Sequence, residues 1–124
     1  MMPQPLILVV DDNPLNADVL EEVLEALDCT VITAFSGEEA IATAKAKPPQ
    51  LVLLDVIMPE MDGPATCQQF KADPDLKTIP IIFMTALDDV DITKVIRNTG
   101  AVGYISKPFQ PNEVIACIQE YLEC

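Results

Sequence analysis

The sequence predicts a single α/β domain built on a doubly wound, five-stranded parallel sheet with helices on both faces. Short apolar or β-branched runs of strand length alternate five times with segments that carry helical periodicity or helix-capping residues. Five consecutive βα units are typical of such a sheet. A length of 124 residues, 50% of them hydrophobic, suits one domain with its own core.

The first two units each combine a short strand with a capped helix. Residues 6–10 form a continuous apolar run, and the Asn-Pro pair at 13–14 supplies a helix cap and a first helical residue. The apolar stripe of this helix consists of Leu20, Val23, Leu24 and Leu27. Residues 30–34 are β-branched, residues 36–39 form a capping box, and the Lys-Pro-Pro run at 47–49 ends the second helix.

The last three units are predicted from the same kinds of signal. Their strands are expected at residues 51–54, 79–84 and 102–105, and their helices from Pro64 to near Asp73, at 88–99 and at 111–122. Proline in the first turn opens the third helix, and Gly100 follows the fourth. The order 2-1-3-4-5, which is that of flavodoxin-like folds, would make the first and third strands neighbours.

The composition excludes several classes of function. A net charge of −13 argues against binding DNA or RNA, which depends on neutralising phosphates. No apolar run reaches the length of a membrane span and no signal-like segment is present, so we expect a cytoplasmic protein without membrane contact. Four cysteines without a C-x-x-C pair, and no histidine, argue against a zinc site, a disulfide framework and serine-histidine catalysis. We expect Cys29 and Cys67 to be small buried residues.

Three aspartates stand where predicted strands end. Asp11 and Asp12 follow the first strand, and Asp55 follows the third. An unpaired buried carboxylate is costly, so two such strands at one sheet edge predict a shared acidic pocket. Like charges in that pocket need a counter-ion, and hard oxygen ligands favour a divalent cation such as Mg²⁺.

Two further strands end at the same edge, with Thr85 after the fourth and Lys107 after the fifth. Together with the aspartates, these residues suit phosphoryl transfer. Asp11 and Asp12 can hold Mg²⁺, and Asp55 can attack phosphorus as a carboxylate nucleophile. Thr85 can donate to a phosphoryl oxygen. Lys107 can pair with another phosphoryl oxygen or, when no phosphoryl group is present, with Asp55.

Four stretches of the chain together resemble the response-regulator receiver domain of two-component signalling. They read VVDD at 9–12, DVIMPEMDG at 55–63, TA at 85–86 and KPF at 107–109. Each motif is common alone, but in this order and spacing they are specific and cover essentially the whole chain. The resemblance implies a flavodoxin-like (βα)5 receiver fold over residues 4–123, with no effector domain in this chain.

The resemblance implies that Asp55 is the phosphoacceptor, charged from a phosphohistidine on a sensor histidine kinase or a histidine phosphotransfer protein. Asp12 would bind Mg²⁺ directly, Asp11 partly through water, and Ile57 through its backbone carbonyl, with Mn²⁺ able to substitute. The chain would then be a signalling domain that catalyses its own phosphorylation and slow dephosphorylation, and not an enzyme in the ordinary sense.

The resemblance also implies a conformational switch. The Thr85 hydroxyl would be drawn toward the phosphoryl group, and Tyr104 would turn into the space it vacates. The Lys107-Pro108 peptide bond would be cis. The fourth helix, fifth strand and last helix would form the face that signals to a downstream effector. The last helix has no Lys or Arg, which weakens the case for a charge-paired dimer, so we expect a monomer or a weak homodimer.

Two positions shape access to the phosphoryl group in this family, and here they are Ile57 and Leu87. Neither apolar side chain can orient an attacking water molecule. We therefore expect a comparatively long-lived phosphoaspartate.

Simpler interpretations of several residues stay open at this stage. Asn13 can serve only as a helix cap, and the Asp-Gly pair at 62–63 only as a turn and cap. Tyr104 alone would more often be a core residue, and Thr85 alone a strand-end hydroxyl. The stripe formed by Cys117, Tyr121 and Cys124 on the last helix is most simply explained by partial burial.

Three other functions are the alternatives. A metal-dependent phosphohydrolase that forms phosphoaspartate would need a second acid where Ile57 stands. A flavodoxin-type binding module would need a phosphate loop rich in Ser, Thr and Gly, but the first loop is acidic. A phosphorylation-independent pseudo-receiver would keep the fold as an interaction module without the chemistry.

Overall fold

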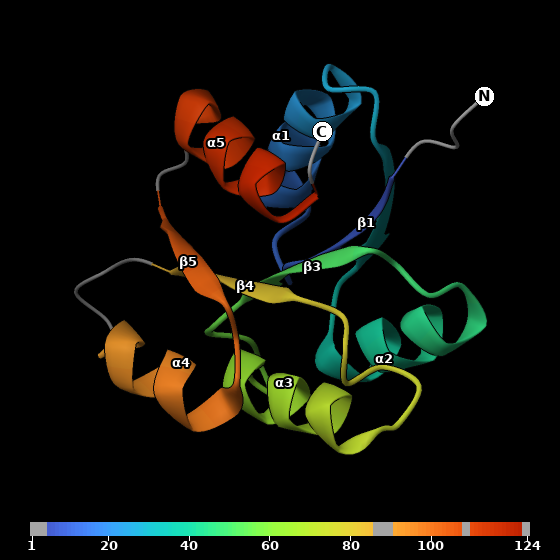
Figure 1. The fold of residues 1–124 in the computed structure, drawn as a ribbon, viewed down its shortest axis with the longest axis vertical. Helices are drawn as coiled ribbons and strands as arrows, with labels where there is room; N and C mark the ends of the chain where they lie inside the picture. The colour runs from blue at the N-terminus through green and yellow to red at the C-terminus, as the bar shows by residue number, and fades with distance from the viewer. Residues whose placement is uncertain (1–4, 86–90, 108–109, 123–124) are drawn as a thin grey trace.

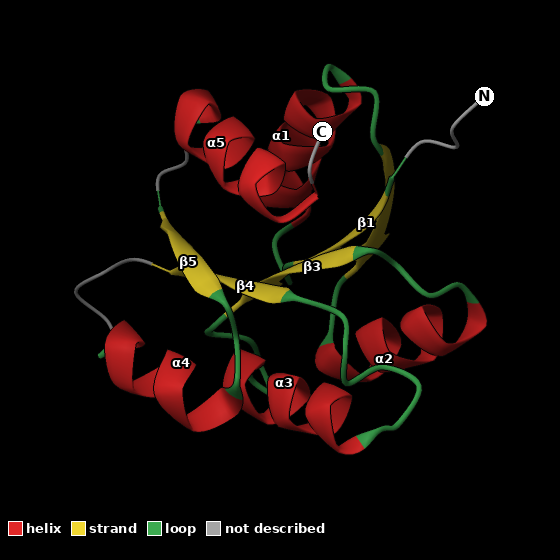
Figure 2. Cartoon of the chain, in the orientation of Figure 1, coloured by secondary structure: helices red, strands yellow, loops and turns green. Residues whose placement is uncertain are grey.

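A computed structural model describes residues 5–85, 91–107 and 110–122. Five parallel strands form one sheet in the order β2-β1-β3-β4-β5, as predicted. The strands are β1 Leu6–Val10, β2 Thr30–Ala34, β3 Leu51–Asp55, β4 Ile81–Thr85 and β5 Gly103–Ser106. The helices are α1 Pro14–Glu25, α2 Gly37–Ala46, α3 Gly63–Ala72, α4 Ile92–Thr99 and α5 Pro111–Leu122. Helices α1 and α5 cover one face of the sheet, and α2, α3 and α4 cover the other (Figure 1 and Figure 2).

The sheet separates two hydrophobic cores. Successive residues of a strand point to opposite faces, so Ile7 and Val9 pack with α1 and α5, whereas Leu8 and Val10 pack on the side of α2 and α3. All five residues of β3 are buried. This two-sided burial explains why the central strands are continuous apolar runs and do not alternate with polar residues. No helix among the described residues is long and apolar enough to cross a membrane.

The helix caps form largely as predicted. Asn13 accepts a hydrogen bond from the Leu15 N–H at 3.0 Å, and Ser36 Oγ accepts one from the Glu39 N–H at 3.1 Å. The Glu39 carboxylate returns to the N–H of Phe35 at 3.2 Å, one residue before the cap. Each cap satisfies backbone N–H groups that a helix start leaves without an intrahelical partner.

Several element boundaries differ from the prediction. Helix α4 begins at Ile92, because Asp91 has a non-helical backbone and caps the helix through the Lys94 N–H. The prediction of a helix from Asp88 was therefore wrong in making Asp91 helical. Asp88 and Asp89 lie outside the described residues. Strand β4 begins at Ile81 and not at residue 79, since the Ile79 N–H closes a turn onto Leu76. Strand β3 extends to Asp55, so this residue belongs to the strand itself.

The remaining sequence predictions on packing are largely confirmed. Cys29 and Cys67 are buried, and Cys117 and Tyr121 are partly buried against the core beneath α1 and α5. The Tyr121 hydroxyl also donates a hydrogen bond to the carbonyl of Val102 at 2.9 Å, which ties α5 to the segment that leads into β5. Cys124 lies outside the described residues.

Asp28, in the turn that follows α1, has a left-handed conformation with φ of 62°. The Asp28 N–H bonds to the Glu25 carbonyl, and the Cys29 N–H to the Leu24 carbonyl, which is the hydrogen-bond pattern of a Schellman motif. Glycine is the usual residue at this position because it has no Cβ to clash in the left-handed region.

Replacing Asp28 by glycine should therefore stabilise the domain. We expect Asp28→Gly to raise the free energy of unfolding by up to ~1 kcal/mol, the relief of left-handed strain being partly offset by greater freedom of the unfolded chain. Asp18→Gly, the same exchange at an exposed helical position of α1, should lower it by ~0.3 kcal/mol. Urea denaturation measures both, and equal effects of the two variants would contradict the strain assigned to Asp28.

Candidate functional site

The strand order brings three aspartates to one point at the carboxyl edge of the sheet. Strands β1 and β3 are hydrogen-bonded neighbours, so Asp11, directly after β1, lies beside Asp55 at the end of β3. One carboxylate oxygen from each of Asp11, Asp12 and Asp55 lies within 4.8 Å of the other two. The residues that the sequence predicted to share an acidic pocket are therefore together.

The three carboxylates differ in burial. Asp11 is fully buried and Asp55 is 5% exposed, whereas Asp12 faces solvent. The Asp11 backbone N–H donates to the Ala34 carbonyl at 3.1 Å, and its Oδ1 accepts the Asn13 N–H at 2.9 Å. These two hydrogen bonds, one donated and one accepted, hold Asp11 in place, while Asp12 remains accessible.

Lys107, directly after β5, reaches across the edge to both buried acids. Its Nζ lies 3.0 Å from Asp55 Oδ1 and 3.3 Å from Asp11 Oδ2. Its backbone N–H donates to the Thr85 carbonyl at 2.8 Å, which anchors the segment from which the side chain extends. Sequence reasoning predicted the pairing with Asp55 and missed the pairing with Asp11. Charge balance was the one sequence signal for the second contact, since Lys107 is the single basic residue predicted to stand at this edge beside three acids.

The pKa of Asp55 reflects this environment. The pKa of its carboxyl is raised from 3.8 to about 6, and burial is the largest of the effects that set this value. The hydrogen bond and charge of Lys107 act in the opposite direction, and the negative charges of Asp11 and Asp12 add to the rise. An ionised Asp55 is therefore costly in the folded protein, and a further cation at the site would stabilise it.

Thr85 and Tyr104 share one face of the sheet but not one environment. In the β4–β5 ladder, Phe83 lies opposite Tyr104 and Thr85 opposite Ser106, so both residues lie on the face that Phe83 turns to the core under α3. Thr85 is 2% exposed at the end of β4, whereas Tyr104 is 43% exposed on the edge strand β5. The interpretation of Tyr104 as a core residue is therefore wrong.

Ile57 occupies a fixed stretch of backbone beside the acids. Its side chain is 56% exposed, but its neighbours Val56 and Met58 are 3% and 7% exposed and belong to the core. The second predicted access residue, Leu87, and the second residue of the predicted cis peptide, Pro108, lie outside the described residues.

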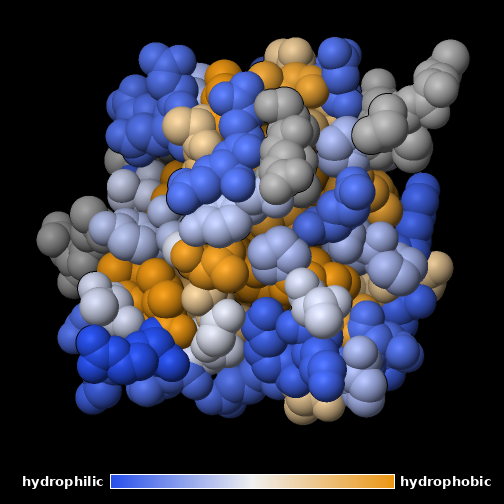
Figure 3. Space-filling view, viewed as in Figure 1, coloured by the Kyte–Doolittle hydropathy of each residue, from blue (hydrophilic) through white to orange (hydrophobic). Residues whose placement is uncertain are grey.

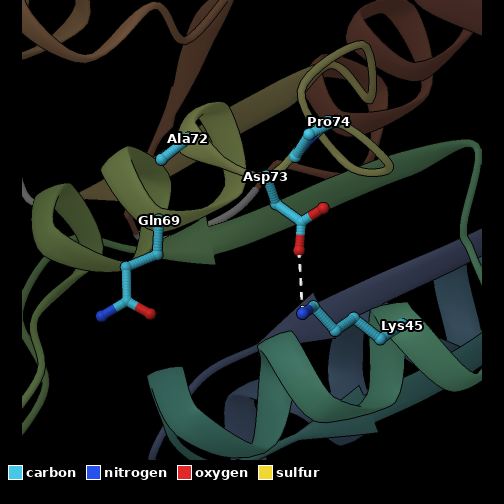
Figure 4. Close-up of a pocket in the computed structure, with 5 residues that line it drawn as sticks. All are labelled: Lys45, Gln69, Ala72, Asp73 and Pro74. Atoms are coloured by element: carbon cyan, nitrogen blue, oxygen red, sulfur yellow. Dashed lines mark ion pairs between the residues drawn. The ribbon is translucent and has the colours of Figure 1, made fainter.

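Other surface hollows carry no comparable chemistry among the described residues. One lies where α2 meets the end of α3 and is lined by Lys45, Gln69, Ala72, Asp73 and Pro74 (Figure 4). An ion pair of 3.0 Å joins Lys45 and Asp73 there, and the N–H of Asp75 and this lysine lower the pKa of Asp73. In the space-filling view, hydrophilic residues cover the helices and hydrophobic ones gather between the two helix layers (Figure 3).

The acidic site fits Mg²⁺ by the chemistry of its donors. Three carboxylates provide hard oxygen ligands, Asp12 is open to solvent, and the buried Asp55 has a raised pKa that a cation would offset. Magnesium binds through few protein carboxylates and keeps several waters, which an edge that is open at Asp12 allows. Fold and site together define a doubly wound α/β domain with an acidic, lysine-paired site at its strand ends.

Comparison with known proteins places this domain in a family. The response regulator receiver domain matches residues 7–119. A probable transcriptional regulator, ycf27, from Porphyridium aerugineum is 40% identical over 98% of this chain, and the chain spans 49% of that relative's length. A response regulator structure from Chloroflexus aurantiacus covers 98% of this chain and 99% of its own, with 33% identity and a TM-score of 0.91.

A third likeness bears on the metal. The receiver domain of sensor histidine kinase PA1611 from Pseudomonas aeruginosa PAO1 is 27% identical to this chain, with a TM-score of 0.88 over 98% of this chain and 99% of its own. The structure of that domain has magnesium coordinated in the active site cleft.

The chain belongs to the response regulator receiver domain family. It is a signalling domain of two-component systems, and its acidic cluster fits the phosphoacceptor and magnesium site of such domains. The phosphohydrolase, the flavodoxin-type module and the pseudo-receiver are not favoured.

The raised pKa of Asp55 predicts a pH dependence of stability. In the folded state the Asp55 carboxyl keeps its proton up to about pH 6, whereas in the unfolded chain the carboxyl loses its proton near pH 3.8. The contribution of Asp55 to stability is therefore fully present below pH 3.8 and is lost as the pH rises through about 6. Without Mg²⁺, wild type should therefore lose on the order of 2–3 kcal/mol relative to Asp55→Asn between pH 3.5 and 7. Denaturation at several pH values measures the difference, and a difference that stays constant with pH would contradict the assigned shift.

Proposed function

We propose that Asp55 is the phosphoacceptor of this receiver domain. The observation that carries the proposal is the position of its carboxylate, which lies at a strand end, 5% exposed, 3.0 Å from the Lys107 ammonium and beside two further acids. The phosphoryl donor is a phosphohistidine on a sensor histidine kinase or a histidine phosphotransfer protein.

In the transfer, an Asp55 carboxylate oxygen forms a bond to phosphorus while the bond between phosphorus and the donor imidazole nitrogen breaks. The electron pair of that bond stays on the imidazole, which takes a proton from solvent. Lys107 then exchanges its contact with Asp55 for one with a phosphoryl oxygen, and Thr85 donates its hydroxyl to another. The domain thereby catalyses its own phosphorylation and, by attack of water, its slow dephosphorylation.

Asp11, Asp12, Asp55 and the backbone carbonyl of Ile57 are the proposed metal ligands. When bound, Mg²⁺ supplies charge neutralisation among the acids and a ligand position for a phosphoryl oxygen. Asp12 is the most accessible of the three carboxylates, which supports direct coordination by this residue, and Asp11 already accepts a backbone N–H, which supports a ligand that acts partly through water. Mn²⁺, which also prefers oxygen ligands, would substitute.

Thr85 and Tyr104 are the proposed switch pair. A phosphoryl group on Asp55 draws the buried Thr85 hydroxyl toward it, and the exposed Tyr104 ring turns inward on the same face of the sheet. The outward position of Tyr104 fits the unphosphorylated state. The rearrangement alters the surface of α4, β5 and α5, where a downstream effector protein or domain binds.

The remaining features of the proposal concern the unit and its setting. Residues 4–123 form the receiver unit, which works as a monomer or a weak homodimer without direct contact to nucleic acid or membrane. Among the described residues, Cys29, Cys67 and Cys117 form no disulfide, which suits the reducing cytoplasm. The Lys107-Pro108 peptide remains a predicted cis bond, since Pro108 lies outside the described residues.

Phosphorylation by a small donor tests the proposal. Incubation with Mg²⁺ and acetyl phosphate should add one phosphoryl group to wild type and none to Asp55→Asn, because the variant lacks the carboxylate nucleophile that attacks phosphorus. Asp75 is an exposed acid outside the acidic cluster, so Asp75→Asn serves as the control and should be phosphorylated like wild type. Intact-mass spectrometry reads the result, and an inert wild type or a modified Asp55→Asn chain would overturn the assignment.

The lifetime of the phosphoaspartate gives a second test. Ile57 and Leu87 cannot orient a hydrolytic water, so the double variant Ile57→Asn with Leu87→Glu should dephosphorylate faster, by roughly tenfold or more if a positioned general base is gained. Loss of the phosphoryl group is followed by mass spectrometry after acetyl phosphate is removed. A double variant no faster than wild type would show that these two side chains do not limit hydrolysis.

A further inference from the structure

The first residue of α3 lies directly against the backbone of Asp55. A Cβ built on Gly63 would collide with the carbonyl oxygen of Asp55, and it would lie 2.8 Å from Val56 Cα and 3.1 Å from the Asp55 carbonyl carbon. These atoms belong to the backbone at the end of β3 and cannot rotate away as a side chain can. Glycine is therefore the only residue that permits this approach without a shift of the sheet or the helix.

Contacts on both sides of Gly63 hold it in this position. Its N–H donates to the Val56 carbonyl at 2.8 Å, which closes the loop between β3 and α3 onto itself. Asp62 caps α3 by accepting the Ala65 N–H at 2.9 Å. Glu60, within the loop, has φ of 63°, a conformation that a residue with a side chain rarely adopts. The loop is thus kept in a strained, closed path.

The closed loop contains the proposed metal-binding backbone. Ile57 lies between the buried side chains of Val56 and Met58, and Val56 is also the residue that Gly63 contacts. Val56 in turn donates its N–H to the Met84 carbonyl at 3.1 Å, so the sheet holds the same peptide from the other side. The peptide that joins Asp55 to Val56 is consequently fixed between β4 and the start of α3.

We propose that Gly63 is a positioning residue for phosphoryl transfer. By letting α3 close against the peptide after Asp55, it sets the place of the Asp55 carboxylate and of the Ile57 backbone relative to Asp11 and Asp12. This inference rests on the proposed function and adds a role for a residue that was expected only to form a turn.

The variant Gly63→Ala tests the positioning role. It should weaken Mg²⁺ binding by ~10–100-fold, the range that supporting residues around a metal site typically control, and slow phosphorylation by acetyl phosphate by a similar factor. Calorimetry measures the Mg²⁺ affinity independently of phosphorylation, and thermal unfolding monitored by circular dichroism reports the folded fraction. Gly37→Ala is the matched control, since Gly37 is also the first residue of its helix but the atoms nearest its Cβ would be side-chain atoms of Thr66 and Met61, which can rotate away, and not backbone atoms of Asp55 and Val56. It should lose stability and keep its Mg²⁺ affinity within about twofold.

A milder pair of variants decides the matter if Gly63→Ala does not fold. Asp62→Ala and Ser36→Ala each remove a helix N-cap of similar worth, but only Asp62 holds the helix end that contacts the Asp55 peptide. Asp62→Ala should weaken Mg²⁺ binding several-fold and speed hydrogen exchange at the Gly63 N–H, whereas Ser36→Ala should change neither. Asp62→Asn, which keeps the cap and removes the charge, should bind Mg²⁺ within about twofold of wild type.

The outcomes separate this inference from the proposed function. One outcome is that wild type accepts a phosphoryl group while Gly63→Ala, or Asp62→Ala in its place, keeps the wild-type Mg²⁺ affinity and phosphorylation rate. In that case Gly63 has no positioning role, and the proposed function stands. A loss in Asp62→Asn equal to that in Asp62→Ala would assign the effect to charge and would also overturn the inference. An inert wild type would refute the proposed function itself.

Discussion

The structure depends on one electrostatic arrangement, in which the Lys107 ammonium lies between the carboxylates of Asp55 and Asp11 at the carboxyl edge of the sheet. Two buried acids side by side are unfavourable unless a cation offsets their charge. One lysine offsets part of it, and the raised pKa of Asp55 shows that burial still prevails. The edge is therefore incompletely neutralised, which favours a divalent cation.

The fold serves this arrangement by fixing backbone at the ends of strands. Asp55 and Thr85 are the last residues of β3 and β4, and Lys107 follows β5 with its N–H bonded to the Thr85 carbonyl. Because the ladder holds the backbones of Asp55 and Thr85, less backbone freedom remains to be lost when the site reaches a productive geometry. On the far side of the Asp55 peptide, Gly63 lets α3 make direct contact. The proposed phosphoacceptor is thus supported by the sheet and by the start of a helix.

Much of this arrangement could be predicted from the sequence, because the signals are local. Apolar runs followed by acids placed Asp11 and Asp55 at strand ends, and the capping residues Asn13 and Ser36 placed helix starts within a residue. The features that the sequence did not predict depend on contacts between distant segments. The burial of Asp11 beside an exposed Asp12, the second partner of Lys107 and the outward Tyr104 follow from how strands and loops pack. Of the two left-handed residues, Asp28 is of a type enriched at positive φ that still adopts it only occasionally, and Glu60 is of a type that gives no such signal.

The central claim is that ionisation of Asp55 and binding of Mg²⁺ are coupled, and proton release during the binding of Mg²⁺ tests it most directly. Calorimetric titrations in buffers of different ionisation enthalpy give the number of protons released per Mg²⁺ bound. With the pKa of Asp55 at about 6, about half a proton should be released at pH 6 and close to none at pH 8. Asp55→Asn should release none at either pH. Absence of proton release from wild type at pH 6, or equal release from Asp55→Asn, would contradict the account.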